Sequence, residues 1–289
     1  MIKWPENLIE DIARRRCVIF LGAGISVGCQ NVEGRKPRTW KEFLTHAVNN
    51  DVARPNKHIK SLIKRQDYLT ACEVIKKSVG RDRFNSLVTE EFLTPRYKPS
   101  NMHEAVFKLD ARIVATPNFD KIYETYANTQ ADGSIRVKNH SDDDVAEAVR
   151  RNHRLILKIH GTIDTPDRMI FTRKEYAEAR QCYRSFYSVL EALALTHTFF
   201  FLGCGVNDPD IRLLLEDNYF RHPTGRPHIM VLPRGEVHDD IVKIIEETMN
   251  VNILLYSKAS DHQELLSSVE ALTNLVDEAR ERLRNNSNW

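Results

Sequence analysis

The chain has little of what marks several large classes of protein. Its five cysteines, at positions 17, 29, 72, 182 and 204, include no CxxC pair, which argues against a four-cysteine zinc site and fits reduced thiols. No stretch approaches the ~18 uninterrupted apolar residues of a membrane span. The first six residues are too polar for a signal peptide. We therefore expect a cytoplasmic protein that is not attached to a membrane.

Excess charge of either sign is also small. The 42 Lys and Arg residues and 40 Asp and Glu residues leave a formal net charge of +2. No global charge attracts nucleic acid or acidic lipid, so we predict no direct binding to either. What the 289 residues do provide is a hydrophobic content of 42%, which is ordinary for a globular protein with a large core.

The apolar residues are grouped in short continuous runs that predict buried strands. The runs cover residues 17–21, 113–115, 155–159, 198–202, 228–232 and 251–255. Strands that are apolar on both faces are typical of a parallel sheet, and helical segments such as 143–151 and 239–249 separate these runs. The alternation predicts an α/β fold with a doubly wound, mostly parallel Rossmann-like sheet.

Residues of about 40–110 interrupt this alternation with helical periodicity and no convincing strand. We interpret them as a helical insertion module within a single domain of residues 1–289. A C-terminal helix is expected at about 260–284, where Ser260 and Gln263 have capping-box spacing and an apolar stripe follows. This stripe docks either on its own domain or on another subunit.

A glycine turn, Gly22-Ala23-Gly24-Ile25-Ser26, directly follows the first apolar run. Such a turn lets backbone N–H groups approach a phosphate closely. The dehydrogenase fingerprint would need a third glycine where Val27 stands, so a hydride-transfer enzyme is not indicated. Taken alone, the turn is equally consistent with a plain strand-to-helix connection.

A second motif, Thr116-Pro117-Asn118-Phe119-Asp120, follows the next predicted strand. Pro117 keeps Thr116 extended, which presents the Asn118 amide at the mouth of the strand. An amide there can bind ribose hydroxyls or an attacking water. Asp120 either fixes this amide or caps a helix that begins near Phe119.

Two further motifs end later strands. His160-Gly161 offers a histidine that acts as a general base or is a satisfied structural residue. Gly203-Cys204-Gly205, with Asn207 and Asp208 after it, offers close approach and ribose-binding oxygens, although Asp208 and Pro209 equally suit a helix start. Because the carboxyl ends of parallel strands meet at one edge of a sheet, we expect all four motifs to form one ligand crevice.

In this order the four motifs resemble the sirtuin family over residues of about 17–255, and the stretch 202–212 resembles its bacterial sirtuin-like group. The resemblance implies a catalytic Asn118, which positions water or ribose, and His160 as general base. It also implies a set of residues that line an NAD site: Gly22, Ala23, Gly24, Ser26, Thr116, Asp120, Gly203 and Asn207.

The chain departs from the protein deacylases of that family. The four cysteines of their structural zinc are missing, and Thr172 and Glu175 open a helix where a peptide-clamping stretch would stand. We therefore predict an NAD glycohydrolase that needs no metal and serves bacterial anti-phage defence by NAD depletion. The alternatives are an NAD-dependent protein deacylase and a non-catalytic NAD or ADP-ribose sensor subunit.

The resemblance also implies assembly and control. Bacterial sirtuin-like proteins of this kind commonly work as oligomers, so we expect a homo-oligomer. Constitutive NAD hydrolysis would be toxic to the cell. We therefore expect a separate sensor or activator protein, such as an ATPase or a nuclease.

Overall fold

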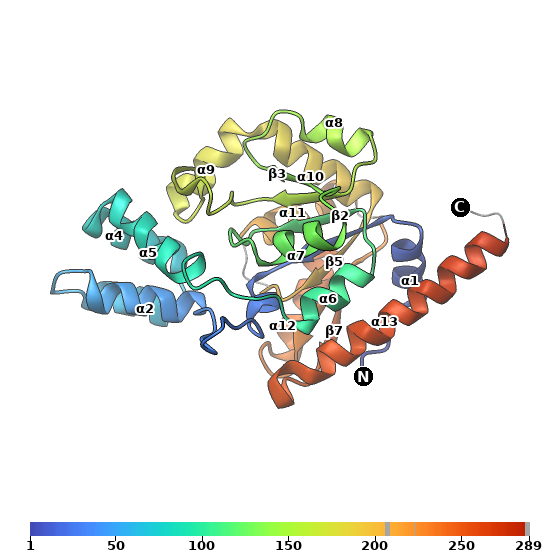
Figure 1. Ribbon diagram of the computed structural model, residues 1–289, viewed down its shortest axis with the longest axis horizontal. Helices are drawn as coiled ribbons and strands as arrows, with labels where there is room; N and C mark the ends of the chain where they lie inside the picture. The colour runs from blue at the N-terminus through green and yellow to red at the C-terminus, as the bar shows by residue number, and fades with distance from the viewer. Residues whose placement is uncertain (206–208, 223, 287–289) are drawn as a thin grey trace.

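Seven parallel strands form one central sheet in the computed structural model, which describes residues 1–205, 209–222 and 224–286 (Figure 1). In chain order they are β1 (Cys17–Leu21), β2 (Ile113–Thr116), β3 (Arg136–Asn139), β4 (Leu155–Lys158), β5 (Thr198–Leu202), β6 (His228–Pro233) and β7 (Val251–Tyr256). Their spatial order is β3-β4-β2-β1-β5-β6-β7. This is the α/β, Rossmann-like fold that the apolar runs predict.

The chain builds the β2–β4 side of the sheet first and then crosses over β1 to build β5–β7. In register, Ile19 of β1 lies between Val114 of β2 and Phe200 of β5. The winding direction therefore reverses at β1, and in open α/β sheets the crevice at such a reversal is where ligands bind.

Side chains of the strands alternate between two hydrophobic layers. Val18 and Phe20 face a cluster that also contains Leu190 and Ile245, whereas Ile19 faces a cluster that contains Val269. Helices of the first layer are α8 (Val145–Arg150), α10 (Arg184–Thr196), α11 (Pro209–Arg221) and α12 (Asp239–Met249). Helices of the second layer are α1 (Glu6–Ala13), α6 (Asn101–Lys108), α7 (Ile122–Gln130) and α13 (Ala259–Asn285).

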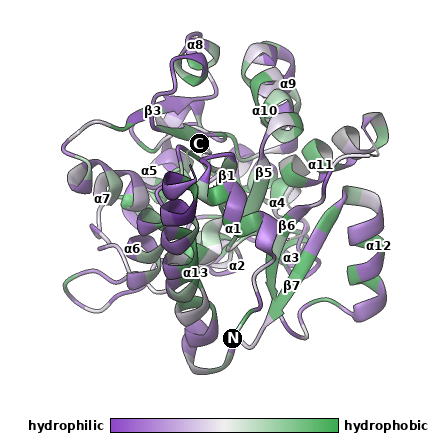
Figure 2. Ribbon diagram, turned by 90° about the vertical axis from the view of Figure 1, so that its right-hand side faces the viewer, coloured by the Kyte–Doolittle hydropathy of each residue, from purple (hydrophilic) through white to green (hydrophobic). Residues whose placement is uncertain are grey.

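The long C-terminal helix α13 lies along α1 and α6 of its own chain (Figure 1). Its apolar stripe is buried there, with Leu265, Val269 and Leu272 all at most 6% exposed. Figure 2 shows the largely hydrophilic remainder of this helix beside the hydrophobic strands. The stripe therefore completes the core of this chain. No helix in the described ranges combines the length and apolarity that crossing a membrane requires.

A separate hydrophobic cluster joins four of the helices between β1 and β2. These are α2 (Trp40–Asn50), α3 (Lys57–Lys64), α4 (Tyr68–Val79) and α5 (Arg81–Phe92). Their cluster includes Phe43 and Phe84 and continues into Phe119 and Phe171, which follow β2 and β4. The rings of Phe119 and Phe171 lie 5.0 Å apart. The helices thus pack against the loops at the carboxyl edge of the sheet.

Some local expectations are confirmed and others are wrong. Thr172 and Glu175 form the expected capping box of α9 (Arg173–Cys182). The box expected at Ser260 and Gln263 does not form, because Ser260 has a φ of 54° and Gln263 contacts Ser267 instead. Strand β3 was not expected at all, since its sequence, Arg-Val-Lys-Asn, is too polar to form an apolar run.

Candidate functional site

The glycine turns after β1 and β5 pack backbone against backbone. The N–H of Gly24 donates to the carbonyl oxygen of Gly203 at 2.9 Å. Gly203 has a φ of +66°, and a Cβ added there would lie 2.5 Å from the backbone nitrogen of Ile25. Such contact leaves no room for a side chain. These glycines therefore pack the two turns against each other. From the sequence they were interpreted as positions where a ligand could approach the backbone closely.

Thr116 and Asn118 connect the end of β2 to the end of β1. The Thr116 hydroxyl donates to the carbonyl oxygen of Leu21 at 2.7 Å and accepts from the Asn118 N–H at 3.0 Å. The Asn118 side-chain Nδ2 donates to the carbonyl oxygen of Gly22 at 3.0 Å. In this orientation the amide nitrogen is fixed, and the side-chain oxygen makes no hydrogen bond to any residue the structure describes.

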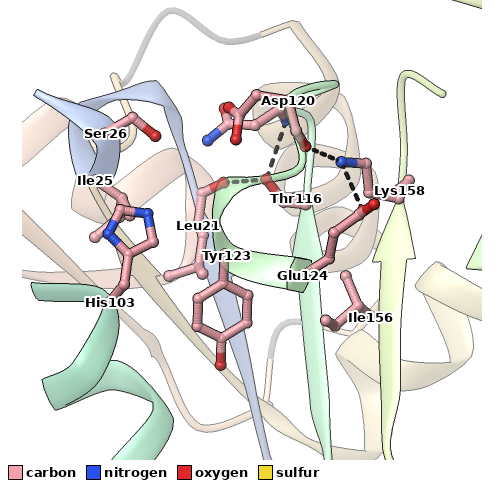
Figure 3. Close-up of a pocket in the computed structure, with 11 residues that line it drawn as sticks. Leu21, Ile25, Ser26, His103, Thr116, Asp120, Tyr123, Glu124, Ile156 and Lys158 are labelled. Carbon is pink, nitrogen blue, oxygen red and sulfur yellow. Dashed lines mark hydrogen bonds and ion pairs between the residues drawn. The ribbon is translucent and has the colours of Figure 1, made fainter. Parts of the chain in front are cut away.

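A narrow pocket opens beside these residues, at the switch point of the sheet (Figure 3). It contains four residues that the sequence points to and several that it does not. The predicted ones are Ser26, Thr116, Asn118 and Asp120, and the others include His103, Tyr123, Glu124 and Lys158. Oδ1 of Asp120 accepts from the N–H of Ile122, the first residue of the following helix, at 2.9 Å, although Lys121 occupies the N-cap position. That helix begins at Ile122 rather than near Phe119.

A buried ion pair supports the floor of the pocket. Nζ of Lys158 lies 3.1 Å from Oε2 of Glu124, and the two side chains are 2% and 7% exposed. The same Nζ donates to the main-chain oxygen of Asp120, so the cation holds the loop that carries Asn118 (Figure 3). A lysine inside an otherwise apolar strand is the sequence signal that could have identified this pair.

His103 enters the pocket from the first turn of α6. The backbone N–H of Ser100 donates to its Nδ1 at 3.3 Å, and Sγ of Cys29 lies 3.8 Å from the same nitrogen. Burial lowers the pKa of His103 to about 4, against a smaller opposing effect of Asp120. The ring is therefore neutral near pH 7.

His160 stands at the end of β4, 7% exposed, and belongs to a different group of contacts. The Tyr176 hydroxyl lies 3.4 Å from its Nδ1, and the two rings meet edge to face with centroids 4.9 Å apart. The loop that follows is tied to the Asn118 loop, because the Ile163 N–H donates to the Phe119 oxygen at 2.9 Å. His160 itself does not line the pocket of Asn118.

Two further residues, Ala23 and Asn207, were predicted to line the NAD site. Ala23 is exposed in the short 3-10 helix η1 (Ala23–Ser26), which forms the expected glycine turn. Asn207 lies outside the described residues. The five cysteines form no disulfide, and four of them are buried.

Known proteins provide a second line of comparison. A family model described as a SIR2-like domain matches residues 112–254, a stretch that contains Asn118, His160 and Gly203 but not the first glycine turn. The chain is 24% identical over 227 residues to the protein named NAD(+) hydrolase ThsA of Acinetobacter baumannii (strain 532279), which covers 75% of this chain and 43% of that protein.

Two other relatives give similar figures. NAD(+) hydrolase ThsA of Enterococcus faecium is 26% identical over 236 residues, which cover 78% of this chain and 45% of that protein. Defense-associated sirtuin 2 of Bacillus subtilis is 23% identical over 219 residues, or 74% of this chain and 20% of that protein. The chain therefore spans less than half the length of these curated relatives.

Proposed function

Because residues 112–254 match a family model described as a SIR2-like domain, we propose that this chain hydrolyses NAD to nicotinamide and ADP-ribose. The observation that carries this proposal is the fixed amide of Asn118. Its nitrogen is held by Gly22, and it lines a pocket at the switch point of the sheet together with Asp120 and Ser26. The names of the relatives, NAD(+) hydrolase among them, support the same activity.

In the proposed reaction the bond between the nicotinamide nitrogen and the ribose anomeric carbon breaks through an oxocarbenium-like transition state. The bonding electron pair leaves with nicotinamide, and a water oxygen adds to the anomeric carbon. The Asn118 oxygen positions this water or the ribose. We assign His160, which stands outside this pocket on a segment joined to the Asn118 loop through Ile163 and Phe119, as the base that accepts the proton from the water or from a ribose hydroxyl. General-base assistance of this kind contributes ~10²–10⁴-fold.

We propose that different residues contact different parts of the NAD molecule. Gly22, Ala23, Gly24 and Ser26 belong to the turn proposed to face the phosphates and ribose. We assign Thr116 and Asp120 to the nicotinamide ribose, and Gly203 to the adenosine half. No metal is required, because water and a protein base supply everything that the hydrolysis consumes.

The test is quantitation of nicotinamide and ADP-ribose released from NAD by the purified protein. Wild type should release both products in equal amounts, and Asn118→Ala and His160→Ala should release neither. Asn49→Ala and His58→Ala are matched controls, because both side chains are exposed on α2 and α3 and neither lines the pocket. Binding of NAD without release would mean either that the activator is missing or that the chain is a sensor, and adding candidate activators separates the two.

The biological role follows from the same activity. We propose that the protein acts in the cytoplasm as an effector of anti-phage defence by NAD depletion, as a homo-oligomer under a separate sensor or activator such as an ATPase or a nuclease. The name of the Bacillus subtilis relative, Defense-associated sirtuin 2, supports this role. Infected cells that express wild type should lose NAD, whereas cells that express Asn118→Ala should not.

A further inference from the structure

His103 lines the same pocket as Asn118 and Asp120, yet the proposed hydrolysis gives it no part. It is 1% exposed overall and comes from α6, a helix that the four sequence motifs do not include. In Figure 3 its ring lies on the Ser26 side of the pocket, across from Glu124 and Lys158, with one ring nitrogen directed toward the interior. The question is which hydrogen bonds this buried ring can make to a molecule in the pocket.

The hydrogen bonds of His103 fix which nitrogen carries its proton. A backbone N–H can only donate, so Nδ1, which receives the Ser100 N–H at 3.3 Å, is an acceptor. The Ser100 hydroxyl lies 3.0 Å from the same nitrogen. Because burial keeps the ring neutral, its single proton is on Nε2. Nε2–H makes no hydrogen bond to another described residue, which leaves it as a donor for the pocket.

Most other donors around the pocket are already engaged. The Thr116 hydroxyl donates to Leu21, the Asn118 amide donates to Gly22, and Lys158 donates to Asp120 and contacts Glu124. His103 is therefore a rigid, neutral donor in a pocket that also holds the carboxylate of Asp120. A neutral acceptor such as an amide carbonyl fits this setting, whereas a carboxylate would be repelled by Asp120.

We propose that His103 is a specificity-determining residue, which donates a hydrogen bond from Nε2 to the carboxamide oxygen of the nicotinamide group. This inference rests on the proposed function, because the carboxamide is the neutral polar group on the ring that NAD hydrolysis releases. His103 binds the leaving group and transfers no proton. It therefore selects substrates that carry a carboxamide.

Product inhibition separates this role from a structural one. Wild-type turnover of NAD should be inhibited by nicotinamide more strongly than by 3-methylpyridine, which has the ring without the carboxamide. In His103→Leu the nicotinamide concentration for half-inhibition should rise about three- to tenfold, the effect of one hydrogen bond. Inhibition by ADP-ribose, the other product, should be unchanged and serves as the control within the same assay.

His103→Gln provides the rescue. A glutamine at this helix position can accept the Ser100 N–H through its oxygen, as in a capping box, and still offers a neutral N–H donor. Nicotinamide inhibition close to wild type in His103→Gln, together with its loss in His103→Leu, would support the proposal. Equal inhibition by nicotinamide in wild type and His103→Leu would overturn it.

Calorimetric binding of nicotinamide and 3-methylpyridine, without NAD, keeps the two proposals distinguishable. If wild type releases no product from NAD, alone or with candidate activators, but binds nicotinamide in a His103-dependent way, the hydrolase proposal fails and the His103 assignment stands. If wild type hydrolyses NAD but binds both pyridines equally, the assignment fails and the hydrolase proposal stands. If wild type binds neither pyridine, the assignment fails.

Discussion

The side-chain nitrogen of Asn118 donates to the carbonyl oxygen of Gly22 at 3.0 Å, which joins the loops that follow the neighbouring strands β2 and β1. This bond leaves the amide oxygen for the pocket. Asn118→Asp keeps the shape of the side chain but replaces the donor with a carboxylate that repels the Gly22 oxygen. We expect kcat/KM to fall about 10²-fold or more, because a small displacement of a positioning group is that costly. Steady-state kinetics on wild type and variant measure it, and unchanged kinetics would refute it.

Gly203 predicts a strong effect of a single methyl group. In Gly203→Ala the new Cβ would meet the Ile25 nitrogen at 2.5 Å at a φ of +66°. Gly235→Ala is the matched control, because its φ is +80° but nothing lies within 4 Å of a Cβ there. The left-handed conformation alone costs an alanine about 1–2 kcal/mol, so Gly235→Ala should lower the melting temperature by only a few degrees. Gly203→Ala should lower it clearly more and abolish turnover, and equal melting temperatures would contradict this packing.

The buried Lys158–Glu124 pair predicts non-additive effects on stability. Lys158→Met alone leaves the Glu124 carboxylate buried without its cation, which typically costs about 3–5 kcal/mol. The double variant Lys158→Met with Glu124→Leu removes both charges and should recover much of that loss. Urea unfolding of both single variants, the double variant and wild type measures the coupling. Additive free energies would show that the pair does not act as a unit.

Recovery of stability should not restore activity. In the double variant the main-chain oxygen of Asp120 has still lost its Lys158 donor. The loop that carries Asn118 is then less fixed, so kcat should stay below the wild-type value. A double variant with full stability and full kcat would show that Lys158 does not position the loop that carries Asn118.

The contact between Tyr176 and His160 predicts that Tyr176→Phe lowers kcat without changing KM. Its hydroxyl lies 3.4 Å from Nδ1 of His160 and its ring packs against the imidazole. Tyr176→Phe keeps the ring contact and removes the polar one, so His160 loses part of its orientation. We expect kcat to fall severalfold with KM nearly unchanged. Tyr68→Phe, on α4, is the control, and a rise in KM alone would argue for a different role.

Buried His228 predicts acid sensitivity. The Phe199 N–H donates to its Nδ1 at 3.1 Å, and burial lowers the pKa of His228 from 6.5 to about 4. Between these values the unfolded chain takes up a proton that the folded chain does not, so stability falls as pH falls from about 6.5 to 4. The loss amounts to roughly 3 kcal/mol.

Urea unfolding at several pH values measures this loss. His228→Gln can keep an acceptor for the Phe199 N–H without titrating, so its stability should depend less steeply on pH. The slopes of wild type and variant should therefore diverge below pH 6.5. Parallel slopes would exclude His228 as a source of acid sensitivity.

The central fold was predictable because its strands are apolar on both faces. The runs at 17–21 and 198–202 match β1 and β5 residue for residue. Strand β3 was missed because Arg136 and Lys138 lie at the sheet edge, where polar side chains reach water. The turn after β1 is a 3-10 helix because Gly24 is held by Gly203, a contact between distant segments that no local pattern contains.

The site was predictable only where its residues follow strands directly. Asn118 and Asp120 belong to that group, and the pocket contains both. His103 and Glu124 both come from the first turn of a helix, so only the packing of α6 and α7 brings them to the pocket. Tyr176 contacts His160 from α9, which lies outside the His160-Gly161 motif, so the motif alone does not identify it.

The central claim is that this chain cleaves NAD with Asn118. The most direct measurement is the amount of nicotinamide and ADP-ribose formed from NAD by purified wild type and by Asn118→Ala, with Asn49→Ala as control. Equal release of both products by wild type and Asn49→Ala, with none from Asn118→Ala, is the predicted result. The same release from Asn118→Ala, or NAD left intact by wild type both alone and with candidate activators, would contradict the claim.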